Sequence, residues 1–313
     1  MEITFISGNS VQKLASPELI DVAGHQHWWL HITASDQKDL EAALGSFEIH
    51  PLTIEDMLNP ATRIKIERFH HYIFFIFRGL ELSDLNIVSR NFYFVLLGYN
   101  LITVTSDPRY NIQDIIDNWQ RWSSSLGRGP EFLIHRILDT ETDHTLNIVH
   151  NIEKMVDHFE EKVFQNDLEI DITRIFVIKG VLQHIKRIIH SHHELFEHLI
   201  RLDQFSEDSL AFYRDVNVHS IRIREQVDSI IDSITSVMEA YVTVSTKRTN
   251  EIIKALTILT AIMLPISLVA GIFGMNFEMI PGLKWQYGFY ASMLIMGGIG
   301  VLMFYLFKKK GWL

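Results

Sequence analysis

The chain contains no cysteine, and this absence excludes disulfide bonds, thiolate metal sites and cysteine nucleophiles. Positive charge is also in short supply, because 38 acidic side chains outweigh 28 lysines and arginines and give a formal net charge of -10. Proteins that bind nucleic acid rely on Lys and Arg contacts to phosphate. A nucleic-acid partner is therefore not expected.

The first 24 residues lack an unbroken apolar stretch of the length found in secretory signals, since charged side chains interrupt them, so export is not expected. No Walker motif or other glycine-rich nucleotide cradle is present. No nucleophile and base occur in a recognisable motif either. We therefore expect no organic cofactor, no ATP-driven step and no enzymatic activity.

Long apolar runs are confined to the C-terminal part, at residues 255–273 and 287–307, and neither run contains a charge. Each has about the 20 residues that a helix needs to cross the roughly 30 Å hydrocarbon core of a bilayer. A pair of buried core helices is the alternative, but charged flanks on both runs favour membrane spans. We expect two transmembrane helices joined by an external loop at residues 274–286.

Basic residues flank the two runs on the sides away from the connecting loop. Since Lys and Arg concentrate on the cytoplasmic side of membrane proteins, both termini are predicted to be cytoplasmic, with residues 308–313 as a basic tail of a multi-pass protein of the cell (inner) membrane. The flanking basic residues are Lys247, Arg248, Lys254, Lys308, Lys309 and Lys310.

One face of the first span, extended at both ends, mixes small, hydroxyl and apolar side chains. Its members recur every three or four residues, as one side of a helix does. Such a face either packs against another helix or lines a pore, and the spacing leaves both open. A pore would need several symmetric copies, because one helix cannot surround it. The residues are Asn250, Ile253, Leu256, Thr260, Leu264, Ser267, Gly271 and Gly274.

Upstream of the spans, strand-like runs alternate with helical stretches over residues 1–130, which predicts a cytosolic α/β domain. Residues 131–254 form a helical region that includes the start of a long helix. This helix is predicted to run from about residue 207 to residue 273, about 100 Å at 1.5 Å per residue. The expected strands are 28–32, 72–77, 92–97 and 101–105, and the other expected helices are 131–166 and 173–202.

The loop after the first span begins with Gly274, Met275 and Asn276, and a Gly-Met-Asn triplet between two C-terminal spans resembles the CorA family of magnesium channels. Residues 49–58 (IHPLTIEDML), 63–77, 213–219 (YRDVNVH) and 249–256 (TNEIIKAL) also resemble family segments, in the same order. The resemblance implies an α+β membrane protein. It would be a funnel-shaped homopentamer with an N-terminal αβα domain, a long stalk helix and two C-terminal transmembrane helices.

The same resemblance implies that Gly274, Met275 and Asn276 form the selectivity filter. Mg²⁺ gives up its water reluctantly, so a ring of neutral amide and carbonyl oxygens would hold the hydrated ion without stripping it. Hydrated Co²⁺ and Ni²⁺ are similar and should also pass. Ile253 and Leu256 resemble the family's hydrophobic constriction, although simple packing is an alternative for them.

The outer loop departs from the family pattern. Gly282 stands where the family commonly has an acid, so the mouth has lost one carboxylate per subunit, while Glu278 remains. We expect weaker concentration of cations at the mouth and no loss of selectivity. The membrane potential alone could drive entry, since two charges crossing 100 mV gain about 4.6 kcal/mol.

Regulation is predicted in the cytosolic part. The resemblance implies that Glu55, Asp56 and Asp215 face one another across subunits and bind divalent metal. Bare carboxylates repel one another and bound Mg²⁺ would bridge them, so internal Mg²⁺ would hold the channel shut. For any one of these acids, a solvated surface charge is the alternative.

The chain has 16 histidines, and four potential metal ligands share one face of the helix predicted at 173–202. The pattern does not match the His-Glu-x-x-His arrangement of zinc proteases. We therefore expect a solvated face, with a modulatory Zn²⁺ or Ni²⁺ site as the alternative. The four residues are His190, His193, Glu194 and Glu197.

Two other functions stay open from the sequence. A related zinc-transporting branch, with or without proton coupling, usually carries Val at the position of Met275, so this Met favours magnesium. A membrane-anchored metal sensor is the other, but an anchor gains nothing from the polar residues Asn250, Thr260 and Ser267. The order of preference among Mg²⁺, Co²⁺, Ni²⁺ and Zn²⁺ cannot be read from the sequence.

Overall fold

The computed structural model describes residues 1–17, 22, 25, 27–108, 110–167, 170–203, 205–275 and 285–312. The chain forms two compact units. One unit comprises Met1–Glu161 and Glu169–Ser236, and the other comprises Lys162–Leu168 and Val237–Leu313. The N-terminal unit contains the sheet, and the C-terminal unit contains the two apolar helical stretches.

A seven-stranded mixed sheet is the centre of the N-terminal unit, with the order β2-β1-β3-β7-β6-β5-β4. Every neighbouring pair is antiparallel except β3 and β7, which are parallel. The strands are β1 (Glu2–Ser7), β2 (Ser10–Leu14), β3 (Trp28–Thr33), β4 (Ile66–Arg68), β5 (Ile73–Ser83), β6 (Asn86–Leu97) and β7 (Asn100–Thr105).

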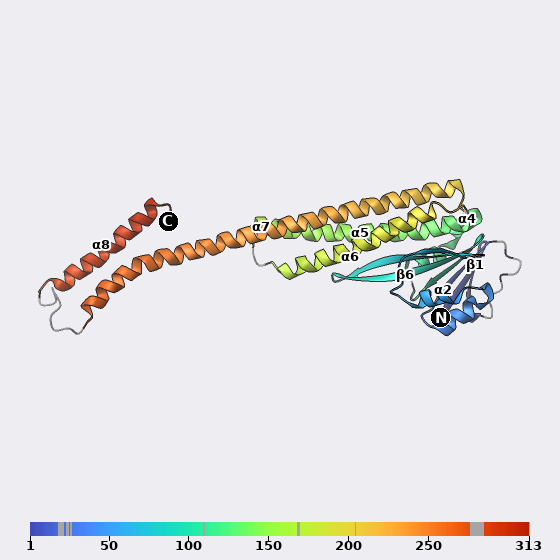
Figure 1. The fold of residues 1–313 in the computed structure, drawn as a ribbon, viewed down its shortest axis with the longest axis horizontal. Helices are drawn as coiled ribbons and strands as arrows, with labels where there is room; N and C mark the ends of the chain where they lie inside the picture. Colours follow the sequence, from blue (N-terminus) through green and yellow to red (C-terminus); the bar gives the residue numbers. More distant parts are fainter. Residues whose placement is uncertain are drawn as a thin grey trace. The chain divides into compact units, whose positions relative to one another are not determined.

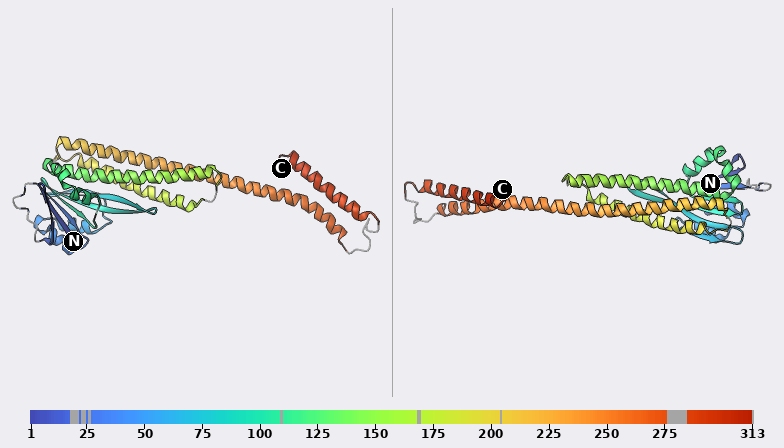
Figure 2. Two further views of the ribbon diagram at one scale, coloured as in Figure 1. Left: turned by 180° about the vertical axis from the view of Figure 1, so that it is seen from behind. Right: turned by 90° about the horizontal axis from the view of Figure 1, so that it is seen from above.

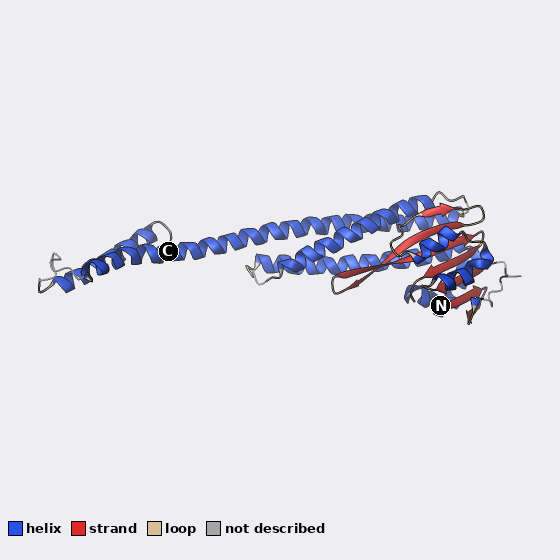
Figure 3. Ribbon diagram, turned by 60° about the horizontal axis from the view of Figure 1, so that its bottom comes forward, coloured by secondary structure: helices blue, strands red, loops and turns tan. Residues whose placement is uncertain are grey.

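Helices cover both faces of this sheet (Figure 3). The short helices α1 and α2 lie on one face, and the longer helices begin after β7. The helices are α1 (Gln37–Leu44), the 3-10 turn η2 (Gly45–Phe47), α2 (Pro51–Leu58), α3 (Tyr110–Asp117), α4 (Trp119–Arg128), α5 (Pro130–Phe164), α6 (Ile172–Leu199), α7 (Glu207–Phe273) and α8 (Gly288–Lys309).

Strand β5 has apolar residues at consecutive positions and does not alternate between apolar and polar ones, because both faces of the sheet are covered. Phe74 belongs to a core shared with α1 and α2, whereas its neighbour Phe75 belongs to a second core shared with α3, α5, α6 and α7. Successive residues of a strand point to opposite faces, so a sheet covered on both faces needs apolar residues at every position. The three-layer αβα arrangement implied by the resemblance is confirmed.

Helices α5 and α6 and the first part of α7 lie side by side (Figures 1 and 2). The buried hydroxyl of Tyr213 donates to the carbonyl of Glu131 at 2.7 Å. Further along, Gln226 donates to Glu153 at 2.8 Å. Both contacts join α7 to α5 in the same chain order, so these two helices run parallel. This pairing fixes which faces of α5 and α7 meet.

Two helices of the described chain, α7 and α8, are long and apolar enough to cross a membrane, and their apolar stretches lie in the C-terminal unit. Within the chain, 0% of the apolar window of α7 and 6% of that of α8 is buried. Helix α8 runs back beside the end of α7 (Figure 1). The prediction of a long helix followed by two C-terminal spans is confirmed as a fold.

Two features of the sheet were not predicted. Strands β1, β2 and β4 were missed, and β5 and β6 extend well beyond the predicted strands at 72–77 and 92–97. Their hairpin turns at Asp84 and Leu85, whose φ angles are 47° and 63°. Tight hairpin turns with two positive φ values usually contain Asn-Gly or Asp-Gly. Without that glycine, the sequence carries no clear hairpin signal.

Candidate functional site

The predicted pore face of α7 is not covered by any other described part of the chain. All eight of its residues, from Asn250 to Gly274, are exposed. The half-buried positions of the same stretch lie on the opposite side of the helix, at 100° per residue. These positions are Lys254, Ile258, Ala261, Ile262, Pro265, Ile266, Val269 and Phe273.

Helix α8 packs on that opposite side. Gly300 approaches α7 closely, since a Cβ atom added there would lie 3.8 Å from Cδ1 of Ile266. Three members of the predicted pore face, Leu256, Thr260 and Leu264, also border a groove of about 540 Å³ with Met303 on its other side. The pore face is therefore not a packing seam with α8. It is free to contact other copies of the chain or to line a pore.

Hydroxyl groups on this face keep acceptor capacity for a hydrated ion. Thr260 donates its hydroxyl hydrogen to the carbonyl of Leu256 at 2.9 Å, so its oxygen lone pairs remain available as acceptors. Pro265 interrupts the backbone ladder of α7, because proline has no N–H to donate. The span thus offers polar oxygens without any charged side chain.

Helix α7 ends just before the predicted filter. The amide of Gly274 donates to the carbonyl of Ala270 at 2.9 Å, and that of Met275 donates to Ile272 at 3.3 Å. The C-terminus of a helix carries about half a negative charge, which favours a nearby cation. The predicted filter residue Asn276, the mouth residue Glu278 and the departure at Gly282 lie outside the described residues.

A group of potential metal ligands joins α5 and α7 in the N-terminal unit. One ligand atom each of Asp139, Asp143 and His219 lies within 4.8 Å of the others. Asp139 and Asp143 are one helical turn apart on α5, so their side chains share a face. Two carboxylates and an imidazole are donors that divalent cations accept, and hard oxygen ligands suit Mg²⁺.

Asp215 lies at the edge of this group. Its carboxylate is 3.9 Å from the Nε2 atom of His219, one turn further along α7. Partial desolvation raises the pKa of the Asp143 carboxyl, and the negative charges of Asp139 and Asp215 raise it further. A bound divalent cation would relieve this crowding of like charges. The structure thus places one predicted ligand beside three that were not predicted.

The other two predicted ligands lie on α2. His50 caps this helix by accepting from the amide of Leu52, and Tyr72 accepts from the amide of His50, which holds the helix to the sheet. Asp56 forms an ion pair with Lys65 at 2.7 Å. Glu55 is exposed. Within one chain, the described residues do not bring either acid together with Asp215 as a ligand group, so the predicted contact across subunits stays a prediction.

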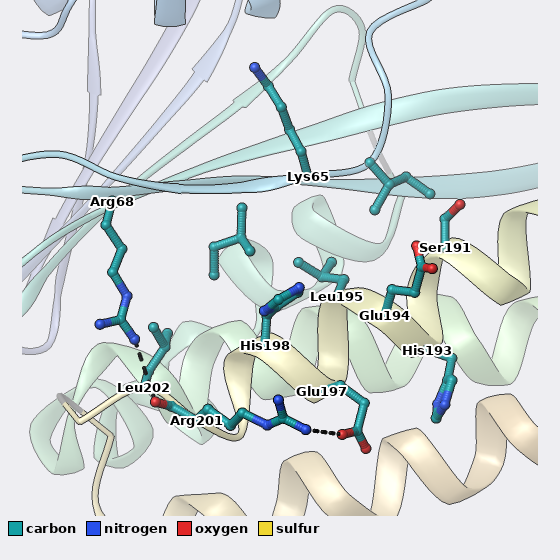
Figure 4. A pocket seen from close by; sticks show the side chains of 12 residues that line it. Lys65, Arg68, Ser191, His193, Glu194, Leu195, Glu197, His198, Arg201 and Leu202 are labelled. Carbon is teal, nitrogen blue, oxygen red and sulfur yellow. Dashed lines mark hydrogen bonds and ion pairs between the residues drawn. The ribbon is translucent and has the colours of Figure 1, made fainter.

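The histidine face of α6 does not form a metal centre within the described residues. His193 is hydrogen-bonded to Asn217 of α7 at 2.7 Å, and Asn217 also donates to Glu197 at 3.3 Å. His190 pairs only with Glu194, at 3.6 Å. Figure 4 shows His193, Glu194 and Glu197 along one wall of a cavity of about 760 Å³ with Lys65 and Arg68 on the strand side. Part of this face therefore joins α6 to α7.

Asp139, Asp143 and His219 were missed for an identifiable reason. Asp139 and Asp143, like Asp215 and His219, are spaced by four residues, but such a pair is common on solvated helix faces and marks no site by itself. The sequence does not state that α5 and α7 are parallel neighbours with these two faces in contact. That information comes from packing, through contacts such as Tyr213 to Glu131.

Comparisons with known proteins agree with this architecture. The model of the CorA-like Mg²⁺ transporter protein family matches residues 24–309. The cobalt/magnesium transport protein CorA of Thermotoga maritima is 28% identical over 291 residues, covering 91% of this chain and 83% of that protein. The cobalt/magnesium transport protein CorA of Methanocaldococcus jannaschii is 22% identical over 320 residues, which cover 99% of this chain and 100% of that protein.

A solved structure gives the same result for the fold. The complete structure of the CorA magnesium transporter from Methanocaldococcus jannaschii superposes with a TM-score of 0.86, covering 100% of this chain and 99% of that chain, at 19% sequence identity. Family model and fold therefore extend over both the sheet-containing unit and the two apolar helices. The chain belongs to the CorA-like Mg²⁺ transporter family, whose members are membrane transporters of divalent cations and not enzymes.

Proposed function

We propose that the chain is one subunit of a homopentameric channel that conducts Mg²⁺, and also Co²⁺ and Ni²⁺, across the cell membrane. One observation carries this proposal: the polar and small face of α7 lies opposite the side that packs against α8. Helix α8 would then lie outside and α7 inside a ring of copies. Such a ring turns the unpartnered face toward a common axis.

Conduction would rest on neutral oxygens. Thr260 and Ser267 present hydroxyl oxygens along the face, and the C-terminal end of α7 adds negative partial charge at Gly274. An ion that keeps its water needs acceptors and no charged ligand, so it can also leave again. With Asn276 as the last ring, this arrangement selects by size and hydration. Both termini would face the cytoplasm, as the flanking lysines favour.

Regulation by internal Mg²⁺ is the second part of the proposal. The group of Asp139, Asp143 and His219, with Asp215 beside it, would hold divalent metal at the contact between subunits. Glu55 and Asp56 of the neighbouring copy would complete the coordination. Mg²⁺ accepts six oxygens and usually keeps several waters, so a loose set of carboxylates from two chains suits it. Bound metal would favour the closed channel.

Flux into liposomes tests the channel. The full chain would be reconstituted with a Mg²⁺-sensitive dye inside, and an inside-negative potential imposed with and without a pH gradient. We expect entry that follows the potential, is indifferent to the pH gradient, and is abolished by Asn276→Ala. Asn151→Ala, an exposed position on α5, is the matched control and should retain full flux.

The same assay separates the other functions. Flux that requires a pH gradient and favours Zn²⁺ would replace the magnesium channel by a proton-coupled zinc transporter, which the cobalt/magnesium names of the relatives do not favour. Metal binding to the cytosolic part without any flux would support the other alternative, a membrane-anchored metal sensor. Unchanged flux in Asn276→Ala would contradict the predicted filter.

A further inference from the structure

Six basic side chains of the C-terminal unit flank the apolar stretches of α7 and α8 on the side away from the connecting loop. None of them forms an ion pair with an acid among the described residues, and Glu251 is the one carboxylate within this part of α7. Five of the six are exposed and Lys254 is half-buried. The six are Lys247, Arg248, Lys254, Lys308, Lys309 and Lys310.

A defined turn holds the two halves of this group together. After α8, the amide of Gly311 donates to Lys308 at 3.1 Å and that of Trp312 donates to Phe307 at 3.0 Å. Gly311 has a φ of +69°, which L residues with side chains rarely adopt. The Nζ atom of Lys254 then donates to the Gly311 carbonyl at 3.3 Å. The lysines of α8 are thereby fixed at the level of Lys254 on α7.

This level is the boundary between hydrocarbon and headgroups. Lys254 directly precedes the apolar stretch of α7, and Lys308 directly follows that of α8. The ring of Trp312 lies 5.7 Å from that of Phe307, and tryptophan favours the same zone. Lipid phosphates occupy this zone and fall within reach of lysine side chains, which extend toward the interface.

We propose that this basic cluster binds the phosphate of an anionic phospholipid headgroup. Cations without an acidic partner at the phosphate level need a counterion. The hydrogen bond between Lys254 and Gly311 holds Lys254 and the lysines of α8 at one place, whereas two independent helix ends would spread them apart. A zwitterionic headgroup brings its own ammonium group and complements the cluster less well. Correct insertion requires only the sum of the basic charges, whereas a binding site requires their fixed position.

Tryptophan quenching by brominated lipids tests the proposal without any measurement of flux. The full chain would be reconstituted in phosphatidylcholine bilayers containing brominated phosphatidylglycerol or brominated phosphatidylcholine, and the relative affinity of the two lipids derived from the quenching. A cation near the surface contributes about a fivefold gain in affinity. We expect wild type to favour phosphatidylglycerol at least about fivefold, and K308Q/K309Q/K310Q to lose this preference.

Two further variants test whether a lost preference could instead result from failed membrane insertion or from a general change of charge. K254Q keeps the three terminal lysines that orient α8 and should still lose most of the preference. K13Q/K38Q/K154Q removes as many positive charges as K308Q/K309Q/K310Q, but from exposed positions of the N-terminal unit. This variant should keep the preference for phosphatidylglycerol. Equal affinity of wild type for both lipids, or equal preference in K254Q and wild type, would overturn the proposal. Displacement by excess inorganic phosphate would show a site for free phosphate instead of lipid.

Discussion

At the scale of single residues, Lys65 places a positive charge between two carboxylates, one of which belongs to the proposed metal ligand Asp56. Its ammonium group lies 2.7 Å from Asp56 and 2.8 Å from Glu67. Although partial burial opposes it, hydrogen bonds and charge from these two acids raise the pKa of Lys65 above its usual value. A tethered cation between two carboxylates competes with any metal for the same oxygens.

Replacement of this lysine gives the first prediction. Lys65→Met removes the competing charge and keeps the aliphatic stem, so Asp56 becomes a stronger metal ligand. We expect inhibition of flux by Mg²⁺ on the cytosolic side of liposomes to need several-fold less Mg²⁺. Lys38→Met, at an exposed position of α1, should leave the inhibitory concentration unchanged. A higher inhibitory concentration in Lys65→Met would instead assign the lysine to the closed arrangement itself.

Asp215 provides the second prediction. Asp215→Lys places a positive charge beside Asp139, Asp143 and His219, where it repels incoming metal. We expect conduction to persist at Mg²⁺ concentrations on the cytosolic side that close the wild-type channel, as measured by dye entry. Asp232→Lys makes the same change at an exposed site further along α7 and should retain inhibition. Inhibition that is equal in both variants would remove the regulatory role of Asp215.

The sequence selects individual candidate residues through family-like segments or through spacing along one helix. Gly274, Met275 and Asp215 were selected by segments that resemble the family, and their functional roles stay predictions. Asp139 and Asp143 carry no motif, because a pair of acids one turn apart on a helix also describes an ordinary solvated face. Their proximity to His219 depends on the packing of α5 against α7, which pairwise spacing along one helix cannot express.

At the scale of elements, α7 is the helix on which the proposed channel depends, and the proposed gate at Ile253 and Leu256 supplies the third prediction. Ile253 and Leu256 are 54% and 61% exposed in the single chain, so a ring of copies would bring several such apolar side chains together and exclude water from the axis. Leu256→Ser and Ile253→Gly should each leave a leaky channel, seen as Mg²⁺ entry under conditions that close the wild type.

Leu259 is the matched control for this gate. It is 56% exposed, lies within one turn of Leu256, and points about 110° away from the centre of the predicted pore face, at 100° per residue. Leu259→Ser should therefore leave closure intact while it perturbs the lipid-facing surface by a similar amount. Leakage in Leu259→Ser, with normal closure in Leu256→Ser and Ile253→Gly, would show that the gate lies on another face of the helix.

Elements with strong patterns were predicted well, and those with weak local signals were not. The helix predicted from about residue 207 to 273 is observed as one helix, because its sequence contains neither glycine nor proline before Pro265. Strand β2 is exposed along almost its whole length, so it has no apolar alternation to reveal it. Its place is set by pairing with β1, which only the assembled sheet provides.

At the scale of the whole molecule, two buried histidines make the stability of the sheet-containing unit depend on pH. Burial lowers the pKa of His31 to about 4 and that of His192 to about 3. His192 stacks on Phe77 with ring centroids 4.0 Å apart, and its Nε2 atom has no hydrogen-bond partner among the described residues. Both side chains are neutral in the folded protein near pH 7.

The fourth prediction follows from the sign of these shifts. Below an unfolded pKa of about 6.5, the unfolded chain binds protons that the folded chain refuses, so stability falls as the pH drops toward 4. Each histidine should cost about 2 kcal/mol between pH 7.5 and pH 5. Thermal unfolding followed by circular dichroism measures this loss, and His192→Leu should reduce its pH dependence. An equal slope in both proteins would exclude His192 as a source.

Assembly is the fifth prediction at this scale. The exposed face of α7 can enclose an aqueous path only when several copies share an axis. Native mass spectrometry of the purified chain should therefore give five times the 36.4 kDa subunit. A stable monomer or dimer that still conducts Mg²⁺ would contradict the proposed ring.

Because α7 connects Asp215 to Gly274, the number of residues between them sets how far one is rotated about the helix axis relative to the other. Both residues lie on α7 or at its immediate end, so each residue inserted between them turns the far end of the helix by about 100° and advances it by about 1.5 Å. Inserting one or two residues near Val242 would rotate the pore face away from the orientation that the cytosolic contacts set. Seven inserted residues would bring that face back to within about 20°. The chain should thus tolerate evolutionary change in the length of this helix in steps of seven far better than in single residues.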